Sequence, residues 1–372
     1  MARQRVAITG APEEAATPAA PAVKRKRNPA QEMEETSNSK ADEIPKASLE
    51  KLLDTGSTLL NLSISGGVVR EGGLPTSIMS EFYGPHGCGK TALVSSCVGS
   101  AQRKFKAKVR YLDPEGRFSK EYARLYGVKI KAEDYKRPDT VAEMFSYMQD
   151  WDTEDMDRVH IIAADSLAAL STELELSKEG DKRGQKRAKD FSEGFRKTAR
   201  KIAHPNRALI SSNQIRTGDD GRDIAPGGTA IGFYMSVIVT VKPTWQANRI
   251  ERERTIVKDV KQKRVVGIRS TCQVVKNSVD RNYRKCNVSF VYDYGIDDIR
   301  DQLEWYKEVT GAKTFDALDS KHHAIDDAID AIEGDHEGPL ELNPRYQALR
   351  NRTIDHWNEV EALFKRQRKA RF

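Results

Sequence analysis

Residues 84–91 read Gly-Pro-His-Gly-Cys-Gly-Lys-Thr and fill every fixed position of the phosphate-binding pattern G-x-x-x-x-G-K-[ST]. An apolar run at 78–82 predicts a strand before this loop, and residues 92–97 are compatible with a helix after it. In that setting the backbone N–H groups surround phosphate oxygens, Lys90 reaches the β- and γ-phosphates, and the Thr91 hydroxyl binds Mg²⁺. A glycine-rich turn that binds nothing rarely meets all of these conditions. The sequence therefore predicts a nucleoside triphosphate site formed by Gly84, Pro85, His86, Gly87, Cys88, Gly89, Lys90 and Thr91.

The overall composition excludes some classes of protein. The 372 residues are 38% hydrophobic, and the formal net charge is +7, which permits a polyanionic partner without requiring one. No run approaches the roughly 20 apolar residues that span a bilayer, and the N-terminus lacks a hydrophobic signal core. We therefore expect a cytoplasmic protein without a membrane partner. The four cysteines form no C-x-x-C pair, which argues against a zinc site or a disulfide framework.

Three regions differ in composition. Residues 1–43 are rich in Ala, Pro, Glu and Lys without apolar periodicity, which predicts a disordered tail. Its basic cluster at 24–27 could contact phosphates or act as an import signal, but a solvated run of charges is the favoured interpretation. Residues 44–311 alternate strand-length apolar segments with helical ones, which predicts an α/β core with a mostly parallel, twisted sheet flanked by helices. Residues 312–372 predict a small helical C-terminal region with a basic end.

Seven apolar segments of the core are candidate strands. They share a length of four or five residues and are bounded by turn or helix signals. The candidates are Ile78–Phe82, Val109–Leu112, His160–Ala164, Ala208–Ser212, Val237–Val241, Cys272–Lys276 and Val288–Tyr292.

Two of these segments are followed by acids that suit triphosphate chemistry. Asp165 follows the apolar run 159–164, so we expect it to organise Mg²⁺ together with Thr91; an ordinary helix N-cap is the alternative. Glu115 follows the strand at 109–112 and should lie at the same carboxyl edge of the sheet, where open α/β folds bind ligands. We expect Glu115 to be the general base that activates water.

The order of these motifs along the chain resembles the RecA family of DNA strand-exchange ATPases. The resemblance covers about residues 48–300 and is carried by segments 84–91, 111–128, 164–170, 212–216 and 227–234, with 274–277 and 292–296 in agreement. It implies a phosphate-loop ATPase fold of RecA type, ATP and Mg²⁺ as cofactors, and a homologous recombinase that forms helical filaments on single-stranded DNA with ATP between subunits. Such a filament pairs with homologous double-stranded DNA in recombination and repair, with single-strand-binding and mediator proteins as further partners. The unusual tails favour a bacteriophage recombinase of the UvsX type, which would act in the host cytoplasm.

The resemblance also implies roles for three further residues. Tyr122 lies where the family stacks an aromatic ring on adenine. Gln214 would sense the γ-phosphate and pass its presence to the following loop; a solvated amide is the alternative. Lys276 would reach the γ-phosphate of the neighbouring subunit, with a surface lysine at a strand end as the alternative.

Two segments are candidates for contact with DNA because cationic loops neutralise backbone phosphates. The first lies at 178–189 between the Asp165 strand and the next helix; a solvated helix face is its alternative. The second, at 216–228, follows Gln214 and has the Gly and Asp content of a mobile loop. The candidate residues are Lys182, Arg183, Lys186, Arg187, Lys189, Arg216, Arg222 and Ile224.

The chain departs from the family pattern in several places. Ser119 replaces an acid that helps to hold adenine, so the base selectivity is open, and Ser278 stands where bacterial relatives often have a second lysine. The segment 244–265 is long and densely charged, and predicts a protruding hairpin or a mobile loop without an assigned function. The alternative functions are a hexameric helicase or DNA motor with the same core, and a non-enzymatic regulator that binds ATP as a switch.

Overall fold

The computed structural model describes residues 47–151, 155, 157–172, 183–217, 223–224, 228–244, 248–257, 260–365 and 368. They belong to one compact unit, residues 45–372. The tail predicted for residues 1–43 lies outside the described residues. None of the helices in the described part of the chain is long and apolar enough to cross a membrane.

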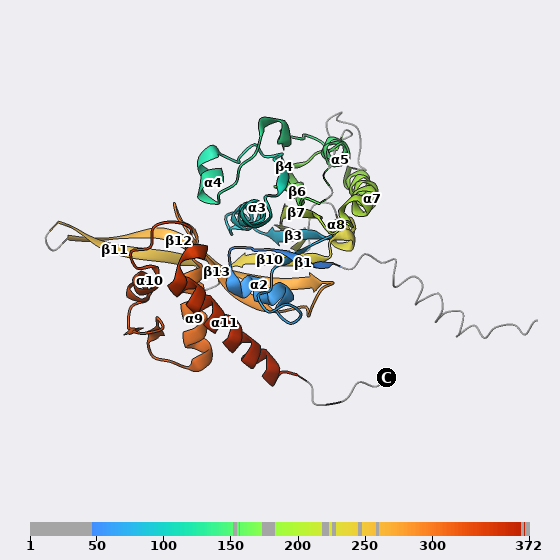
Figure 1. The fold of residues 1–372 in the computed structure, drawn as a ribbon. Helices are drawn as coiled ribbons and strands as arrows, with labels where there is room; N and C mark the ends of the chain where they lie inside the picture. Colours follow the sequence, from blue (N-terminus) through green and yellow to red (C-terminus); the bar gives the residue numbers. More distant parts are fainter. Residues whose placement is uncertain are drawn as a thin grey trace, which may run out of the picture. The chain divides into compact units, whose positions relative to one another are not determined.

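The helices and strands alternate along most of the chain (Figure 1). The helices are α2 (Thr58–Ser65), α3 (Lys90–Phe105), α4 (Lys120–Leu125), α5 (Val141–Gln149), α7 (Arg183–Ile202), α8 (Gly228–Tyr234), α9 (Asp298–Thr310), α10 (Ile325–Glu333) and α11 (Pro344–Leu363), with 3-10 turns η1 (Ala132–Asp134), η2 (Leu167–Ala169) and η3 (Leu340–Leu342). The strands are β1 (Ser48–Leu53), β2 (Leu74–Thr76), β3 (Met79–Gly84), β4 (Lys108–Leu112), β5 (Tyr135–Lys136), β6 (His160–Ala164), β7 (Arg207–Gln214), β8 (Arg216–Thr217), β9 (Asp223–Ile224), β10 (Val237–Pro243), β11 (Arg249–Val257), β12 (Val260–Asn277), β13 (Lys285–Val291), β14 (Gly295–Ile296), β15 (Phe315–Asp316) and β16 (Lys321–His322).

The central sheet confirms the predicted fold class. Its strand order is β14-β13-β12-β10-β3-β7-β6-β4-β5, with β11 paired to β12 at one side. The strands from β10 to β5 are parallel, whereas β11 to β14 pair antiparallel. All seven predicted strands form within this sheet. The nearly unbroken apolar sequences of β3 and β6 follow from burial on both faces, which is typical of parallel strands.

Alternate residues of each central strand face two different hydrophobic clusters. In β6, Ile161 and Ala163 join the cluster that includes α2 and α3, while Ile162 and Ala164 join the cluster that includes α5 and α7. Figure 1 shows α3 and α4 on one side of the parallel strands and α5, α7 and α8 on the other. The four cysteines are buried free thiols within the first cluster, as expected of small apolar residues.

The C-terminal elements share a core with α9. Ile299 and Leu303 of α9 cluster with Ile332 of α10 and Leu349 of α11. The domain boundary expected at 311–312 therefore separates α9 from α10 and α11, although these helices share one hydrophobic cluster. A smaller cluster of Leu62, Ile354 and Trp357 joins α11 to α2.

A buried carboxylate links three helices, α2, α9 and α11. Asp298 is 2% exposed and accepts hydrogen bonds from the Thr58 backbone N–H (2.7 Å), the Thr58 hydroxyl (2.7 Å) and the Tyr346 hydroxyl (2.8 Å). Burial raises the pKa of this carboxyl group above its usual range. Asp298 therefore holds the starts of these helices together by polar contacts, which a count of apolar residues does not reveal.

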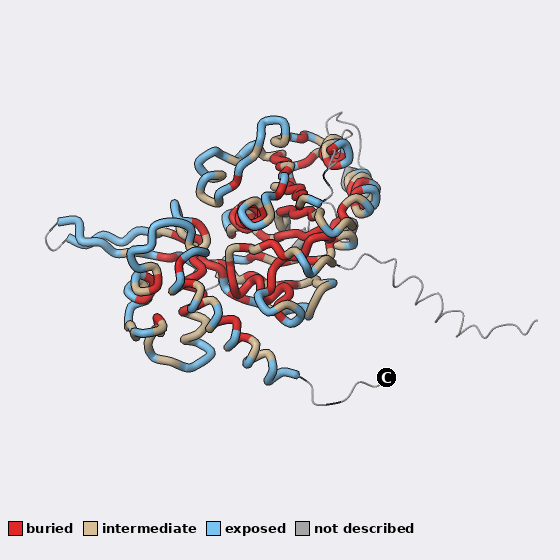
Figure 2. Tube along the Cα trace, in the orientation of Figure 1, coloured by how far each residue is buried: buried red, intermediate tan, exposed pale blue. Residues whose placement is uncertain are grey.

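The charged segment at 244–265 contributes to a hairpin, one of the two predicted possibilities. Strand β11 pairs antiparallel with the first part of β12, from Arg249 opposite Ile268 to Val257 opposite Val260. We call residues 249–257 and 260–268 the arm. Figure 1 shows the arm projecting away from the central sheet, and Figure 2 shows that its outer part is exposed.

Candidate active site

The phosphate loop joins the end of β3 to the start of α3, as the sequence predicts. Gly87 and Gly89 have φ values of 66° and 95°, a backbone region that residues with a side chain seldom adopt. A Cβ atom on Gly89 would also lie 2.4 Å from the ring of Phe290. Local conformation and close packing therefore both require glycine at position 89.

Lys90 is held inside this loop by backbone carbonyl groups. Its Nζ donates to the oxygens of Gly84 (3.0 Å) and Pro85 (2.5 Å), and the residue is 8% exposed. The ammonium group therefore lies beside the backbone that the motif assigns to phosphate binding.

A cavity of about 110 Å³ brings three of the four predicted catalytic residues, Lys90, Glu115 and Gln214, together at the carboxyl edge of the sheet. Its walls come from the ends of β3, β4, β6 and β7, which are adjacent parallel strands, so residues that follow them meet at one edge. The predicted residues that line it are His86, Gly87, Lys90, Thr91, Glu115, Asp165 and Gln214. Asp113, Arg117, Phe118, Ser166 and Ser212 complete the wall.

Asp165 lines the cavity and fits a role in holding Mg²⁺. It follows β6 and accepts hydrogen bonds from the Ser212 hydroxyl and the Tyr111 hydroxyl (3.4 Å). Burial raises its pKa, whereas hydrogen bonds from Ser212 and Thr91 act in the opposite direction. A carboxylate beside the Thr91 hydroxyl offers the oxygen ligands that Mg²⁺ prefers.

Glu115 and Gln214 are in direct contact. The Oε1 atom of Glu115 accepts from Gln214 Nε2 (2.8 Å) and from the Ser166 hydroxyl (2.7 Å). Its Oε2 atom lies 3.2 Å from Nη1 of Arg117. The proposed general base is therefore oriented by the residue that the resemblance assigns to sensing the γ-phosphate.

Asn213 fixes the backbone of Gln214. Asn213 Oδ1 accepts from the backbone N–H of Gln214 (2.9 Å), and Asn213 Nδ2 donates to Oε1 of Glu81 (2.9 Å). Glu81 lies on β3, three residues before the phosphate loop, and burial raises its pKa to about 7. The pair joins the end of β7 to the strand that carries the loop, and neither residue was predicted from the sequence.

Asp113 shapes the turn that presents Glu115. It is 1% exposed, and its Oδ2 atom accepts from the Tyr135 hydroxyl (2.6 Å) and the Phe118 backbone N–H (2.9 Å). No role was predicted for Asp113 from the sequence, although an acid directly after a buried strand was a usable signal. Asp113 is therefore a positioning residue for the turn at 113–118.

Tyr122 lies outside the cavity, and Phe118 is the aromatic residue in its wall. The Tyr122 ring contacts Phe118 (centroids 6.2 Å apart) and Tyr126 (5.0 Å). The hydroxyl of Ser119 accepts from the Tyr122 backbone N–H (3.1 Å) and caps α4. Serine at 119 thus has a structural role in starting the helix that carries Tyr122.

The first DNA candidate segment differs from the expected loop, because from Arg183 onward it belongs to α7. Lys189 is exposed, and Lys186 forms an ion pair with Asp190 (3.1 Å). Lys182 and the side chain of Arg183 lie outside the described residues.

Arg187 is better explained as a structural residue than as a DNA contact. It is half-buried, and its Nη2 donates to the backbone oxygens of Leu167 (3.3 Å) and Ala168 (3.0 Å). Its guanidinium group also lies over the Phe191 ring, 5.9 Å from the centroid. Arg187 thus fixes α7 to η2, and we remove it from the set of candidate DNA contacts.

The second DNA candidate segment starts directly after β7. Its backbone forms a short ribbon in which Arg216 pairs with Ile224 and Thr217 with Asp223. Arg222 lies outside the described residues, as do the side chains of Arg216 and Ile224. The ribbon nevertheless begins two residues beyond Gln214 along the chain.

Lys276 does not line the cavity that contains Glu115. Its Nζ donates to the backbone oxygens of Gly232 (2.8 Å) and Phe233 (3.0 Å) in the last turn of α8, and burial lowers its pKa. Phe233 is 76% exposed. Lys276 therefore has a partner in its own chain and lies beside an uncovered aromatic ring.

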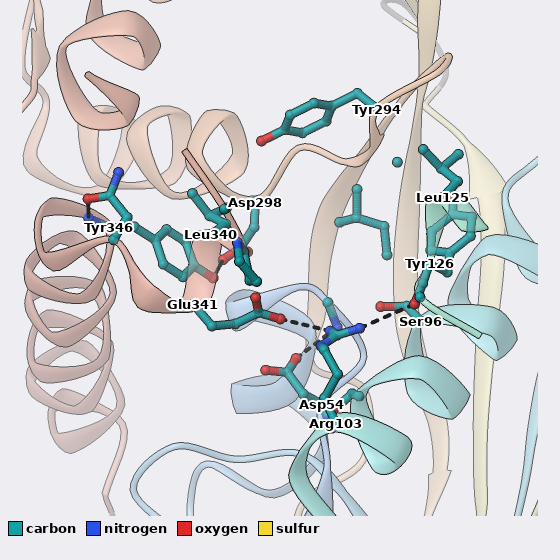
Figure 3. A pocket seen from close by; sticks show the side chains of 18 of the residues that line it. Asp54, Ser96, Arg103, Leu125, Tyr126, Tyr294, Asp298, Leu340, Glu341 and Tyr346 are labelled. Carbon is teal, nitrogen blue, oxygen red and sulfur yellow. Dashed lines mark hydrogen bonds and ion pairs between the residues drawn. The ribbon is translucent and has the colours of Figure 1, made fainter. Parts of the chain in front are cut away.

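A second cavity, of about 650 Å³, contains none of the predicted site residues. It lies between the end of α3, the residues after α4, β14 and the C-terminal elements. Figure 3 shows Arg103 reaching Glu341, a pair 2.7 Å apart, with Asp54 and Tyr126 close by. Acidic and basic side chains are mixed in its wall, so its charge favours no particular ligand.

The fold and the site define an ATPase-type core with a phosphate loop. Residues 39–297 match the family model of the RecA N-terminal domain. The Protein RecA of Thermus thermophilus is 28% identical over 264 residues, which cover 70% of this chain and 72% of that protein. The Protein RecA of Chloroherpeton thalassium is 30% identical over 261 residues, which cover 68% of this chain and 67% of that protein. The chain therefore belongs to the RecA family of recombinases.

Proposed function

We propose that this protein is an ATP-dependent homologous recombinase that assembles on single-stranded DNA and exchanges strands with a homologous duplex. The observation that carries the proposal is the contact between Gln214 and Glu115, which joins the hydrolytic site to the segment at 216–224. A change at the nucleotide is thereby linked to a change in a candidate DNA-binding segment.

Hydrolysis of ATP would use the residues around the 110 Å³ cavity. The loop backbone and Lys90 would bind the phosphates, and Thr91 with Asp165 would hold Mg²⁺, which would supply positive charge to neutralise the phosphate oxygens. Glu115 accepts a proton from water as the water oxygen attacks the γ-phosphorus and the bond to ADP breaks. The Ser166 hydroxyl, which donates to Oε1 of Glu115 (2.7 Å), orients the carboxylate for this step.

Gln214 would act as the switch. In the structure its side-chain amide donates to Glu115 (2.8 Å), and its backbone is fixed through Asn213. A γ-phosphate offers a stronger, charged acceptor for the same amide. Reorientation of Gln214 toward phosphate would release Glu115 for catalysis and shift the ribbon that begins at Arg216.

The DNA contacts are proposed for the N-terminal part of α7 and for the segment after Gln214. They comprise Lys182, Arg183, Lys186, Lys189, Arg216, Arg222 and Ile224. The finer assignment to a bacteriophage recombinase of the UvsX type rests on the tails, and single-strand-binding and mediator proteins follow from the resemblance alone.

Removing cations from the start of α7 tests this DNA contact. The triple change of Arg183, Lys186 and Lys189 to Gln is expected to lower the slope of log affinity against log salt for single-stranded DNA by about 0.7 per lost phosphate contact. The control changes Arg196, Lys197 and Arg200, three exposed cations near the other end of the same helix, to Gln. Equal slopes for both variants and the unchanged protein would show that the start of α7 is a solvated face.

Electron microscopy separates a recombinase from the alternative, a hexameric helicase or motor. The protein, single-stranded DNA and a slowly hydrolysed ATP analogue are expected to give open helical filaments, because head-to-tail contacts that do not close build helices. Closed rings under the same conditions would favour the motor and contradict the proposal.

A further inference from the structure

The arm is a two-stranded ribbon over most of its length. Residues 267–273 of β12 pair with β13 on their other side, whereas residues 260–265 pair only with β11. Figures 1 and 2 show the outer part projecting from the sheet and exposed along both strands. A two-stranded ribbon without a third strand or a helix against it is marginally stable in water. The outer arm therefore gains little stability from burial, and its side chains are available to a partner.

The two faces of the arm carry different charge patterns. On one face Glu253 lies opposite Lys263, and Glu251 and Thr255 point the same way. Here Lys261 forms an ion pair with Glu253 (3.1 Å), and Lys263 forms one with Glu251. The charges of this face are thus largely matched within the arm, and we call it the paired face.

The opposite face collects arginines, and we call it the arginine face. Arg252 lies directly opposite Arg264, and Arg254 follows two residues along β11, opposite Gln262. Like charges directly opposite each other destabilise a sheet. The arrangement therefore costs free energy in the free protein unless an anion lies against it.

Nearby acids neutralise the arginine face only in part, at Arg252. Oδ2 of Asp326 lies 3.8 Å from Nε of Arg252, but the same carboxylate accepts from Arg300 Nη2 at 2.7 Å. Within the described ranges, no carboxylate forms an ion pair with Arg254 or Arg264, and Arg264 donates to the neutral Gln262 (3.0 Å). The face thus presents guanidinium groups with room for an external anion.

The outer end of the arm is apolar. Ile256, Val257 and Val260 are 59%, 64% and 51% exposed, next to the arginine face. A cationic ribbon with an apolar end suits a partner that has a row of negative charges next to an apolar surface. Duplex DNA is such a partner, because backbone phosphates border grooves that contain sugars, base edges and thymine methyl groups.

We infer that the arm lies in a groove of duplex DNA, with Arg252, Arg254 and Arg264 bound to backbone phosphates. A two-stranded ribbon fits the major groove of B-form DNA, and guanidinium groups bind phosphates through two parallel hydrogen bonds. Arg252 and Arg254 are two residues apart on one face, or about 6.7 Å, the axial rise of two nucleotides. The inference rests on the proposed function in one respect, since a recombinase must receive a duplex in addition to its single strand.

Two matched triple variants test the inference. The first changes Arg252, Arg254 and Arg264 to Gln on the arginine face. The control changes Arg249, Lys261 and Lys263 to Gln, which removes the same charge from the paired face of the same arm. Binding of a fluorescent 30-base-pair duplex is measured by anisotropy at several salt concentrations, with thermal melting to check that both variants fold.

The arginine-face variant is expected to lose up to about 2.7 from the slope of log affinity against log salt, at about 0.9 per phosphate contact. The slope of the control variant should differ from that of the unchanged protein by no more than about half of the change expected for one phosphate contact. Hydrolysis of ATP stimulated by single-stranded DNA should be the same in all three, because the arm contributes nothing to the catalytic cavity.

Equal slopes for the arginine-face variant and the unchanged protein would overturn the inference. If that variant keeps its duplex slope but fails to assemble on single-stranded DNA, measured by light scattering, the face binds acids of a neighbouring subunit and the inference is likewise overturned. Absence of DNA-stimulated hydrolysis in the unchanged protein would instead contradict the proposed function, while the duplex slopes would still report on the arm.

Discussion

Changing Glu115 to Gln is expected to slow ATP hydrolysis about a hundredfold or more and to leave ATP binding intact. Glutamine keeps an oxygen that can accept from Ser166 and Gln214, so the cavity should hold its shape, but the amide cannot take the proton of the attacking water. The measurement is the single-turnover rate with single-stranded DNA, together with binding of a fluorescent ATP analogue.

The matched control for this variant is Glu121→Gln. Glu121 is an exposed glutamate on α4, six residues further along the chain, so the control removes the same charge without entering the cavity. It should hydrolyse ATP at the normal rate. A rate for the Glu115 variant within about threefold of the unchanged protein would exclude Glu115 as the general base.

Mixing two inactive proteins should restore hydrolysis if ATP lies between subunits. Lys276 does not reach the cavity of its own chain and lies beside the exposed ring of Phe233, a surface that a neighbouring subunit could cover. We propose that it reaches the γ-phosphate held by the next subunit, where a second cation stabilises charge in the transition state. Glu115→Gln and Lys276→Ala proteins should each hydrolyse ATP at about a hundredth of the normal rate or less.

In an equal mixture, roughly one head-to-tail interface in four would join an intact Glu115 to an intact Lys276. DNA-stimulated hydrolysis should therefore return to about a quarter of the normal rate. The Lys276→Ala protein alone must still bind single-stranded DNA, because Lys276 also contacts the end of α8 and its loss could disturb that helix. Mixed assembly without recovered hydrolysis would reduce Lys276 to a structural role.

The parallel core could be predicted from the sequence because its signals are local. Buried parallel strands appear as short apolar runs, and the loop at 84–91 has its own residue pattern. The strands β1, β2, β5, β8, β9, β14, β15 and β16 were not predicted, since they are short or lie at sheet edges where their pairing depends on distant residues. Of these, β15 and β16 lie in the C-terminal region that was predicted to be helical. The start of α7 was also misplaced, because glycine and several cations in that segment favoured a loop.

The meeting of Glu115, Asp165 and Gln214 at one cavity could be anticipated, because each follows or ends a parallel strand and such residues share an edge. The hydrogen bonds between these residues could not be predicted from the sequence. The Glu115 to Gln214 hydrogen bond depends on the turn that Asp113 fixes, and Arg187 turns toward η2 because backbone oxygens there are within reach. Both results come from tertiary packing, which neither spacing nor composition records.

Strand exchange with a slowly hydrolysed ATP analogue tests the central claim most directly. A labelled single strand, preassembled with the protein and the analogue, is mixed with a homologous duplex or with a heterologous duplex of equal length. We predict that the label enters the homologous duplex and not the heterologous one, because ATP binding, and not its hydrolysis, favours the active filament. Failure of exchange with the analogue, combined with unwinding of either duplex when ATP is supplied, would contradict the assignment as a recombinase and identify a motor.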